Sequence, residues 1–370
     1  MRSPAIPLFS SARAEAGVDL REPIDRVLRS HHYILGAEVQ GFEAEFARYI
    51  GVAHCVAVAN GTDALEIALR ALGVASGDRV VTAANAGFYA STAIHAVAGT
   101  PLYADIDDER MTLAPAAVER ALAHRPKAVI VTHLYGRLAD VEAIASLCRA
   151  AGVALVEDCA QAHGAALRGR RAGSFGDIAC FSFYPTKNLG AAGDGGAITT
   201  NHEGLERRSR QLRQYGWSRK YAVDVAGGRN SRLDEIQAAV LRAKLPTLDA
   251  QNAERRRLAA RYDTAFSQLP LRVAGSRAAD DVVHLYVVRT RRRDQLRSAL
   301  LEAGIGSDIH YPVADHSQAA YAKQAAAVEL PLTEAACREC LSLPCFPGLS
   351  DAEQDQVIEA VRAFFSVDPR

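Results

Sequence analysis

Short apolar runs rich in β-branched residues alternate with segments of helical period through the first two thirds of the 370-residue chain. In one helical segment the apolar residues Leu65, Ala68, Leu69 and Leu72 form a single stripe. Strands that alternate with helices predict an α/β fold, in which helices cover both faces of a mostly parallel sheet. The predicted strands are residues 54–59, 79–83, 101–106, 128–132, 153–157, 178–183 and 196–200.

The last two predicted strands break this alternation. Only a dozen glycine-rich residues separate Phe183 from Gly196, which is barely enough for a crossover helix. We therefore expect the strand 196–200 to run antiparallel to its neighbours. The sequence predicts a mixed, mostly parallel sheet of seven strands.

The character of the chain changes after Leu245 and Pro246. A long polar, arginine-rich helix is predicted over residues 249–266, followed by a strand over 284–289 and by helices with an apolar face near the C-terminus. We expect a large α/β domain with an N-terminal arm over residues 1–245, and a smaller α+β domain over 246–370.

The charge balance excludes several kinds of partner. Acidic and basic residues number 43 each, so there is no global field to attract nucleic acid or an anionic membrane, and no apolar run reaches membrane-spanning length. The odd number of cysteines, seven, fits a cytoplasmic protein in a reducing compartment.

Cys337 and Cys340 are spaced as the ligands of a metal site often are. No second pair of cysteines or histidines completes a set of four ligands, so no metal is expected.

Three groups suited to chemistry follow predicted strands at their carboxyl ends, where ligands bind in open α/β sheets. Gly61 and Thr62 begin a helix whose free N–H groups suit a phosphate, Asp158 follows the fifth strand, and Lys187 follows the sixth. Taken singly, these are an ordinary helix start, a turn residue and an exposed lysine. Together they supply what pyridoxal phosphate (PLP) needs: a phosphate site, an acid partner for the pyridinium nitrogen and an amine for the aldehyde.

A phosphotransferase that uses the glycines between 193 and 196 is a rival interpretation. Phosphate loops lead from a strand into a helix, whereas these glycines lead into a strand, and no Gly-Lys-Ser/Thr follows. A second rival, a non-catalytic regulator with a PLP-type fold, would be favoured by loss of Lys187, Asp158 or the phosphate residues. All of them are present.

The order of motifs resembles the DegT/StrS family of PLP-dependent sugar aminotransferases, which have the type I, aspartate-aminotransferase fold. No single motif is specific for this family, but the order in which the motifs occur over nearly the whole chain is highly specific for it. The matching segments are residues 33–36, 60–65, 157–164, 181–190, 228–239, 309–312 and 341–344.

The resemblance implies roles for matching residues of the cofactor site. Lys187 is similar to the Schiff-base lysine of the family, which also moves the proton between substrate and cofactor. Asp158 would keep the pyridine nitrogen protonated, and Gln161 would lie near the phenolic oxygen. Ser182, with Gly61 and Thr62, would bind the phosphate.

The resemblance also implies residues at the edge of the site. Asn230 would reach the phosphate from the other subunit, which implies a homodimer with shared active sites. An aromatic residue would stack on the cofactor, and Tyr89 is preferred to Phe88 because its spacing to Thr92 fits better. His310 and Tyr311 resemble substrate-binding positions, although an ordinary strand-to-loop junction is an equal alternative.

A lysine rather than a histidine at position 187 favours transamination over dehydration. The segments 214–221 and 230–234 resemble members that act on dTDP-linked 3-keto-6-deoxy sugars, with L-glutamate as the expected amino donor. A 4-keto nucleotide sugar and a keto-cyclitol stay open as alternatives. The product would be an amino sugar for antibiotic or surface-glycan biosynthesis.

Overall fold

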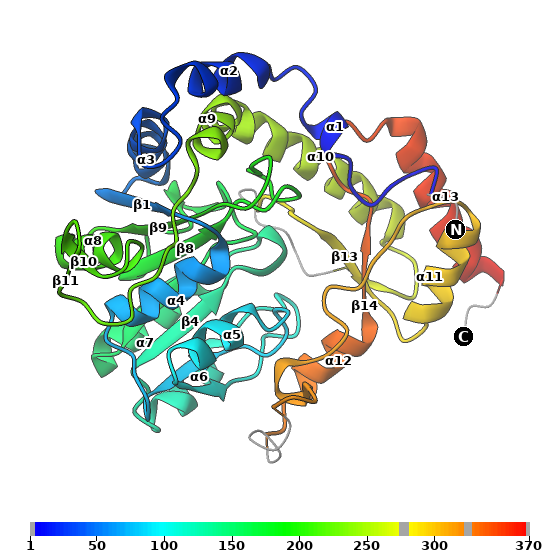
Figure 1. Ribbon diagram of the computed structural model, residues 1–370. Helices are drawn as coiled ribbons and strands as arrows, with labels where there is room; N and C mark the ends of the chain where they lie inside the picture. Colours follow the sequence, from blue (N-terminus) through cyan, green and yellow to red (C-terminus); the bar gives the residue numbers. More distant parts are fainter. Residues whose placement is uncertain (1–3, 274–280, 322–327, 368–370) are drawn as a thin grey trace.

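A seven-stranded sheet forms the centre of the larger part of the molecule (Figure 1). The computed structural model describes residues 4–273, 281–321 and 328–367. In spatial order the strands are β1 (His54–Val58), β9 (Gly196–Thr200), β8 (Ile178–Ser182), β5 (Ala154–Asp158), β4 (Ala128–Thr132), β2 (Arg79–Thr82) and β3 (Thr100–Tyr103). Strand β9 pairs antiparallel with both β1 and β8, and the other neighbours pair parallel. The predicted fold class and the predicted direction of β9 are confirmed.

Alternate residues of the six strands other than β3 enter two separate apolar cores, one on each face of the sheet. In β4, Val129 and Val131 belong to one core, and Ala128 and Ile130 belong to the other. The first core is covered by α3 (Ala37–Ile50), α6 (Pro115–Leu122), α7 (Val141–Ala151) and α9 (Glu235–Lys244). The second is covered by α4 (Gly61–Ala71), α5 (Tyr89–Ala96) and α8 (Glu203–Leu212).

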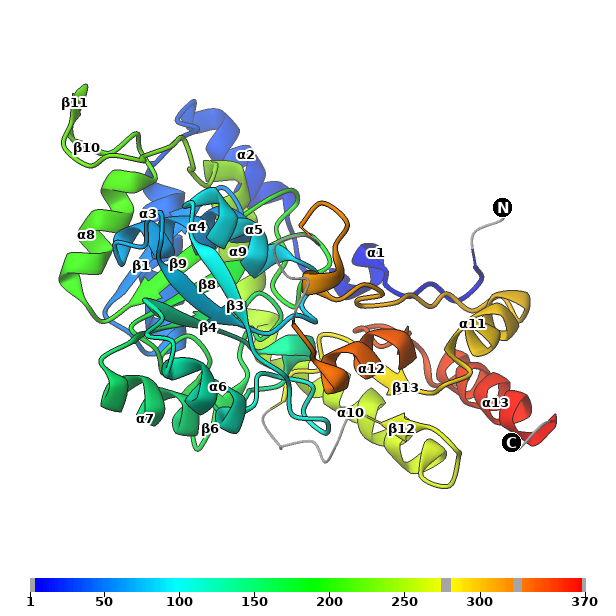
Figure 2. The ribbon, with the colours of Figure 1, turned by 90° about the horizontal axis from the view of Figure 1, so that it is seen from below.

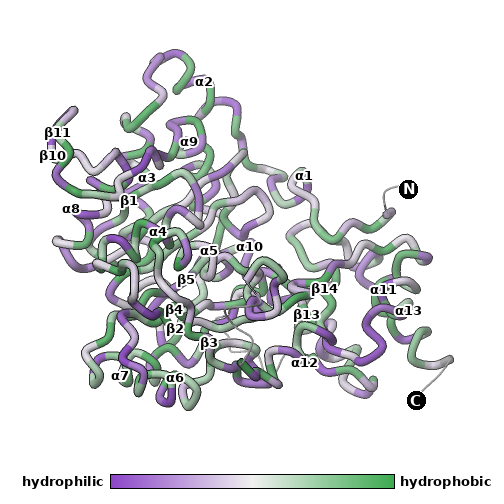
Figure 3. The backbone as a smooth tube through the Cα atoms, turned by 60° about the horizontal axis from the view of Figure 1, so that its bottom comes forward, coloured by the Kyte–Doolittle hydropathy of each residue, from purple (hydrophilic) through white to green (hydrophobic). Residues whose placement is uncertain are grey.

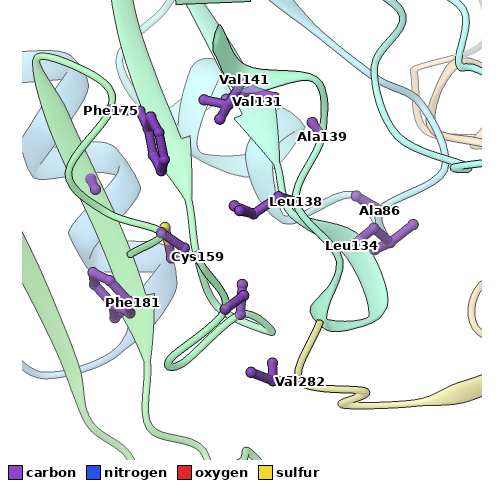
Figure 4. Close-up of a cluster of buried hydrophobic side chains, with 14 of the residues drawn as sticks. Ala86, Val131, Leu134, Leu138, Ala139, Val141, Cys159, Phe175, Phe181 and Val282 are labelled. Carbon is purple, nitrogen blue, oxygen red and sulfur yellow. The ribbon is translucent and has the colours of Figure 1, made fainter. Parts of the chain in front are cut away.

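The first core reaches the end of the sheet where Asp158 lies. Figure 4 shows Cys159, Phe181 and Val282 among its side chains, next to Leu134 and Ala86. These residues come from four strand ends and from a loop before the small sheet. The core therefore supports the loops that carry the candidate site residues.

A small antiparallel sheet and its helices form a third core. The sheet contains β12 (Arg272–Val273), β13 (Tyr286–Arg289) and β14 (Cys340–Leu343). The C-terminal half of α10 (Leu248–Phe266) packs there with α11 (Arg293–Glu302) and α13 (Asp351–Val367). Hydrophilic and hydrophobic stretches alternate along α11 and α13 (Figure 3), as in helices that bury one face. The domain boundary at 245/246 stays a prediction.

The remaining elements are short or peripheral. They are α1 (Ser11–Ala14), α2 (Arg21–Ser30), α12 (Pro331–Glu339), and the two hairpins β6 (Ala166–Leu167) with β7 (Arg170–Arg171) and β10 (Trp217–Arg219) with β11 (Ala222–Val223). Of the spaced cysteines, Cys337 lies in α12, whereas Cys340 begins β14. Within the described ranges, no helix combines the length and apolar character needed to cross a membrane.

One carboxylate joins α3 and α9, two helices that cover the large sheet, through hydrogen bonds. Glu235, at the start of α9, accepts hydrogen bonds from the N–H groups of Gly36, Glu38 and Val39, at 2.7, 2.8 and 2.9 Å. Gly36 is the N-cap of α3 and has no side chain to do this. The side chain of Glu235 therefore caps a helix whose N-cap residue lies 199 residues earlier in the chain.

We expect Glu235→Gln to destabilise the protein by about 1–3 kcal/mol, because an amide NH2 would replace one acceptor oxygen and face buried N–H donors. The shift in the midpoint of thermal unfolding measures this. Glu203→Gln is the matched control, since Glu203 is exposed in the first turn of α8. Equal midpoints for the two variants would show that the cap contributes nothing.

Candidate active site

The predicted site residues meet because six strands of the large sheet run in one direction. The carboxyl ends of β1, β2, β5 and β8 lie at the same edge, and candidate residues lie at or just after each of them. A cavity of about 860 Å³ opens at this edge, a size typical of small-molecule sites. Its lining includes Gly61, Thr62, Tyr89, Asp158, Gln161, Ser182, Lys187, His310 and Tyr311.

The start of α4 and the end of β8 form an anion site, which we define as Gly61, Thr62 and Ser182. Asn60 caps the helix by accepting from the Asp63 N–H at 2.8 Å, and the N–H groups of Gly61 and Thr62 have no partner within the helix. A Cβ on Gly61 would lie 2.6 Å from the Cβ of Ser182, so only glycine permits this approach. Two N–H groups, a hydroxyl and a helix N-terminus suit a phosphate.

Lys187 and Asp158 face the same cavity from adjacent strand ends. Lys187 lies in a turn after β8, with its N–H bonded to the Tyr184 carbonyl at 2.8 Å. Burial lowers the pKa of Lys187 to about 8, against the opposing charge of Asp158. Burial also raises the pKa of Asp158, although the Ala160 N–H, the Lys187 charge and the Thr132 hydroxyl act in the other direction. The pair supplies an amine that deprotonates readily and a carboxylate held by two hydrogen bonds, from Ala160 at 3.1 Å and Thr132 at 3.2 Å.

Glu157, next to Asp158, is a structural residue. Its buried carboxylate accepts from the N–H groups of Gly173, Phe175 and Gly176, at 2.9, 2.6 and 2.7 Å, and lies 3.0 Å from Nε2 of His133. His133 Nδ1 accepts from the Ala139 N–H, so Nε2 carries the proton. His133, Glu157 and Cys159 have ligand atoms within 4.8 Å of one another. The lone pairs of the carboxylate are already used by this network.

Gln161 and Tyr311 form a hydrogen-bonded pair at the cavity. Gln161 Oε1 accepts from the Tyr135 N–H at 2.7 Å, so its Nε2 faces the hydroxyl of Tyr311, at 3.1 Å. The Tyr89 ring meets the Tyr311 ring edge-on, with centroids 6.0 Å apart. His310 is held by Ser342, whose Oγ lies 2.9 Å from Nδ1.

Two predicted site residues lie elsewhere. Phe88 is absent from the cavity lining, because its backbone is left-handed (φ 70°) and its ring packs against His95 and Tyr321. Of the two candidate stacking residues, Tyr89, the preferred one, lines the cavity, and stacking on the cofactor stays a prediction for it. Asn230 is exposed near the hairpin β10–β11 and is also absent from the lining formed by this chain.

Sequence reasoning missed His284, which lines the cavity. Asn188 Nδ2 donates to the carbonyl of Val282 at 3.0 Å and to Oδ1 of Asn252 at 2.8 Å, so Asn188 Oδ1 faces the ring of His284, 3.0 Å from Nδ1. Nδ1 therefore carries the proton and Nε2 is left as an acceptor. Burial keeps the pKa of His284 well below its ordinary value, so the ring is neutral.

The first residues of the chain also line the cavity, through Leu8 and Phe9. Nothing in the sequence indicates that Leu8 and Phe9 lie in the same site as Lys187. The same holds for His284, a single histidine just before a strand. Their positions depend on tertiary packing.

Comparison with known proteins identifies the chemistry of this site. A family model described as the DegT/DnrJ/EryC1/StrS aminotransferase family matches residues 15–362. The chain is 44% identical over 366 residues to a dTDP-3-amino-3,4,6-trideoxy-alpha-D-glucose transaminase of Streptomyces venezuelae, covering 97% of this chain and 96% of that protein.

Solved structures agree. The crystal structure of S. venezuelae DesV in complex with a ketimine intermediate superimposes with a TM-score of 0.92 at 44% identity, covering 98% of this chain and 99% of that one. The structure of NtdA from Bacillus subtilis with bound cofactor PMP has a TM-score of 0.91 at 29% identity, covering 99% and 86%. The anion site, the carboxylate and the lysine fit such a cofactor, so the prediction of a PLP-dependent aminotransferase is confirmed. This chain belongs to the DegT/DnrJ/EryC1/StrS aminotransferase family.

Proposed function

We propose that the enzyme transfers an amino group from L-glutamate to a dTDP-linked 3-keto-6-deoxyhexose, giving an amino sugar for antibiotic or surface-glycan biosynthesis. The observation that carries this proposal is the cavity in which Lys187, with its lowered pKa, faces Asp158 and the anion site. The name of the S. venezuelae relative supports the dTDP-linked 3-amino sugar.

The residues of the site divide the work between holding the cofactor and moving protons. Bound PLP supplies an aldehyde for an amine and an electron-withdrawing ring. The N–H groups of Gly61 and Thr62 and the hydroxyl of Ser182 would hold its phosphate. Asp158 would keep a proton on the ring nitrogen, and Tyr89 would pack on the ring face. The second N–H of Gln161 Nε2, not used by Tyr311, would donate to the phenolic oxygen.

Lys187 acts twice in each half-reaction. Its amine would hold the cofactor aldehyde when no substrate is bound. In each half-reaction the free amine would move one proton between the substrate carbon and the carbonyl carbon of the cofactor, away from the donor carbon in the first and toward the former keto carbon in the second. A pKa near 8 suits both steps, because the amine and the ammonium are each accessible near neutral pH. His310 and Tyr311, which line the cavity from the segment between α11 and β14, are proposed to bind the sugar.

We propose a homodimer with shared active sites. The hairpin β10–β11 projects from the edge of the molecule (Figure 2) and exposes Tyr221 and Val223, at 77% and 63%. Apolar side chains exposed together suit a contact with another chain. Asn230 pairs with Gln214 beside this hairpin, so a partner seated on the hairpin would bring Asn230 to the partner's site. We also place the enzyme in the cytoplasm, where its seven free cysteines would stay reduced.

The pH dependence of labelling at Lys187 tests whether the pKa of its amine is lowered as proposed. In cofactor-free protein, labelling of Lys187 by an amine-selective reagent should be half-maximal near pH 8, as burial disfavours the ammonium. Asp158→Asn should move this midpoint to lower pH, because the charge that favours the ammonium is lost. Peptide mass spectrometry measures both, with the exposed Lys127 as internal reference. A midpoint that does not respond to Asp158→Asn would contradict the coupling.

The two half-reactions test the proposed substrates. L-glutamate should bleach the yellow colour of the PLP-loaded enzyme, and a dTDP-3-keto-6-deoxyhexose should restore it. Lys187→Ala should still bind PLP but lose turnover by roughly 10³-fold or more, since it lacks the proton carrier. Lys127→Ala, at an exposed position, is the control.

Recovery of the colour with only a 4-keto nucleotide sugar or a keto-cyclitol would replace the proposed substrate. Retained turnover in Lys187→Ala would remove Lys187 from catalysis. A protein that binds PLP but shows neither half-reaction would be a regulator.

Co-expression tests the shared site. Lys187→Ala and Asn230→Ala subunits, each carrying a different affinity tag, should form hybrid dimers in which one site has both defects and the other has none. At limiting PLP, a random mixture should recover about a quarter of the wild-type activity, because half of the dimers are hybrids with one intact site. Activity no higher than that of the two parents, or a monomer in sedimentation analysis, would contradict the proposal.

A further inference from the structure

Residues 4–15 form a strap that runs beside α11 and α13 to α1 (Figures 1 and 2). At its start, Ile6 pairs with Ile305: its N–H donates to the Gly304 carbonyl at 3.1 Å, and its carbonyl accepts from the Gly306 N–H at 2.7 Å. The side chain of Ile6 is buried with α10 and α13. The strap is thus fixed to the part of the chain that carries β13 and β14.

The other end of the strap is fixed beside the Lys187 turn. Glu15 accepts from Lys244 Nζ at 2.9 Å, and the same ammonium donates to the carbonyl of Gly190 at 2.6 Å. Arg13 donates to both carboxylate oxygens of Glu353, at 2.8 and 2.9 Å. Lys244 is itself buried, so this attachment is shielded from solvent.

Between these two attachments, Leu8 and Phe9 line the cavity. The Phe9 ring packs edge-on against the buried Phe346, with centroids 5.9 Å apart. Ile309, Leu343 and Cys345 line the cavity from the same core, and together these five residues are the apolar lining. The polar groups that this part of the chain adds to the cavity include Asp308, His310 and Tyr311.

The cavity wall therefore combines groups from two sources. The strand ends of the large sheet and the segments that follow them supply Lys187, Asp158 and the anion site, together with apolar residues such as Leu65 and Leu134. The strap, β14 and the segments on either side of β14 supply the five residues of the apolar lining, next to His310. In a hexopyranose, carbon 6 is attached to carbon 5, which is two bonds from carbon 3 around the ring, and carbon 6 points outward from the ring. A sugar that presents carbon 3 to Lys187 directs carbon 6 away from the lysine, toward the rest of the lining.

We propose that Leu8 and Phe9 contact the 6-methyl group of the sugar and so select 6-deoxyhexoses over 6-hydroxyhexoses. This inference rests on the proposed function and adds a specificity-determining segment to it. A 6-hydroxyl placed against the apolar lining would lose its hydrogen bonds to water without replacement. An apolar pocket of this kind discriminates against an added hydroxyl by roughly 10- to 100-fold.

Equilibrium binding tests the proposal without turnover. The probes are dTDP-6-deoxyglucose and dTDP-glucose, which carry no ketone and cannot react, titrated calorimetrically into the PLP-loaded enzyme. The wild-type protein should bind the 6-deoxy sugar about tenfold or more tightly. Leu8→Asn, a polar side chain of similar size, should reduce the ratio of the two dissociation constants to within about threefold of one, mainly by weakening the 6-deoxy ligand.

Two control variants separate contact from folding. Leu8→Met keeps an apolar side chain of similar volume and should retain the preference. Leu301→Asn makes the same change at an exposed leucine of α11 and should bind both probes as the wild type does. The thermal midpoint and the yellow colour of each variant report whether it folds and holds PLP.

A wild-type ratio near one, or a ratio unchanged by Leu8→Asn, would overturn the role of the strap and leave the proposed function standing. Binding of neither probe at millimolar concentration would instead overturn the dTDP-sugar substrate on which the inference depends. The proposal is supported if Leu8→Asn loses the preference for the 6-deoxy sugar while Leu8→Met and Leu301→Asn keep it.

Discussion

The antiparallel pairing of β9 between β1 and β8 is the constraint on which the site depends. Because β9 runs against both neighbours, β1 and β8 run in the same direction and end at the same edge. Gly196 of β9 pairs with both Val58 and Ser182, and a Cβ there would lie 2.4 Å from the backbone of Asn60. The first turn of α4 and the end of β8 can therefore approach closely enough to form one anion site.

The burial of this edge determines how its charges behave. Lys187 and Asp158 have only part of their solvation, so each shifts toward its neutral form, and each also stabilises the charge of the other. Glu157, one residue earlier, is satisfied by three N–H groups and His133. Adjacent carboxylates of one strand end thus have different tasks, because one side chain faces the loop backbone and the next faces the cavity.

The sequence predicted the sheet well because burial on both faces leaves a strong apolar signal. All seven strands occur where expected, although β3 ends at Tyr103 because Ile106 pairs with Leu113 instead. Residues fixed by strand ends, such as Asp158 and Lys187, were predicted for the same reason. Phe88, the second candidate for stacking on the cofactor, lies outside the cavity lining, since the left-handed turn before α5 directs its ring to His95 and Tyr321. His284 and Leu8 reach the cavity through contacts between distant segments, which leave no local pattern.

The position of the strap has a consequence for altered forms of this protein. A chain begun at an internal start codon about ten positions downstream would keep every residue of the family motifs and would pass any motif-based inspection. It would lack Leu8 and Phe9, and with them one wall of the cavity. An affinity tag fused ahead of Pro4 would likewise enter the protein beside Gly304 and Gly306, a short distance along the chain from that wall. Changes to residues 4–15 are therefore changes to the cavity, although these residues belong to none of the motifs.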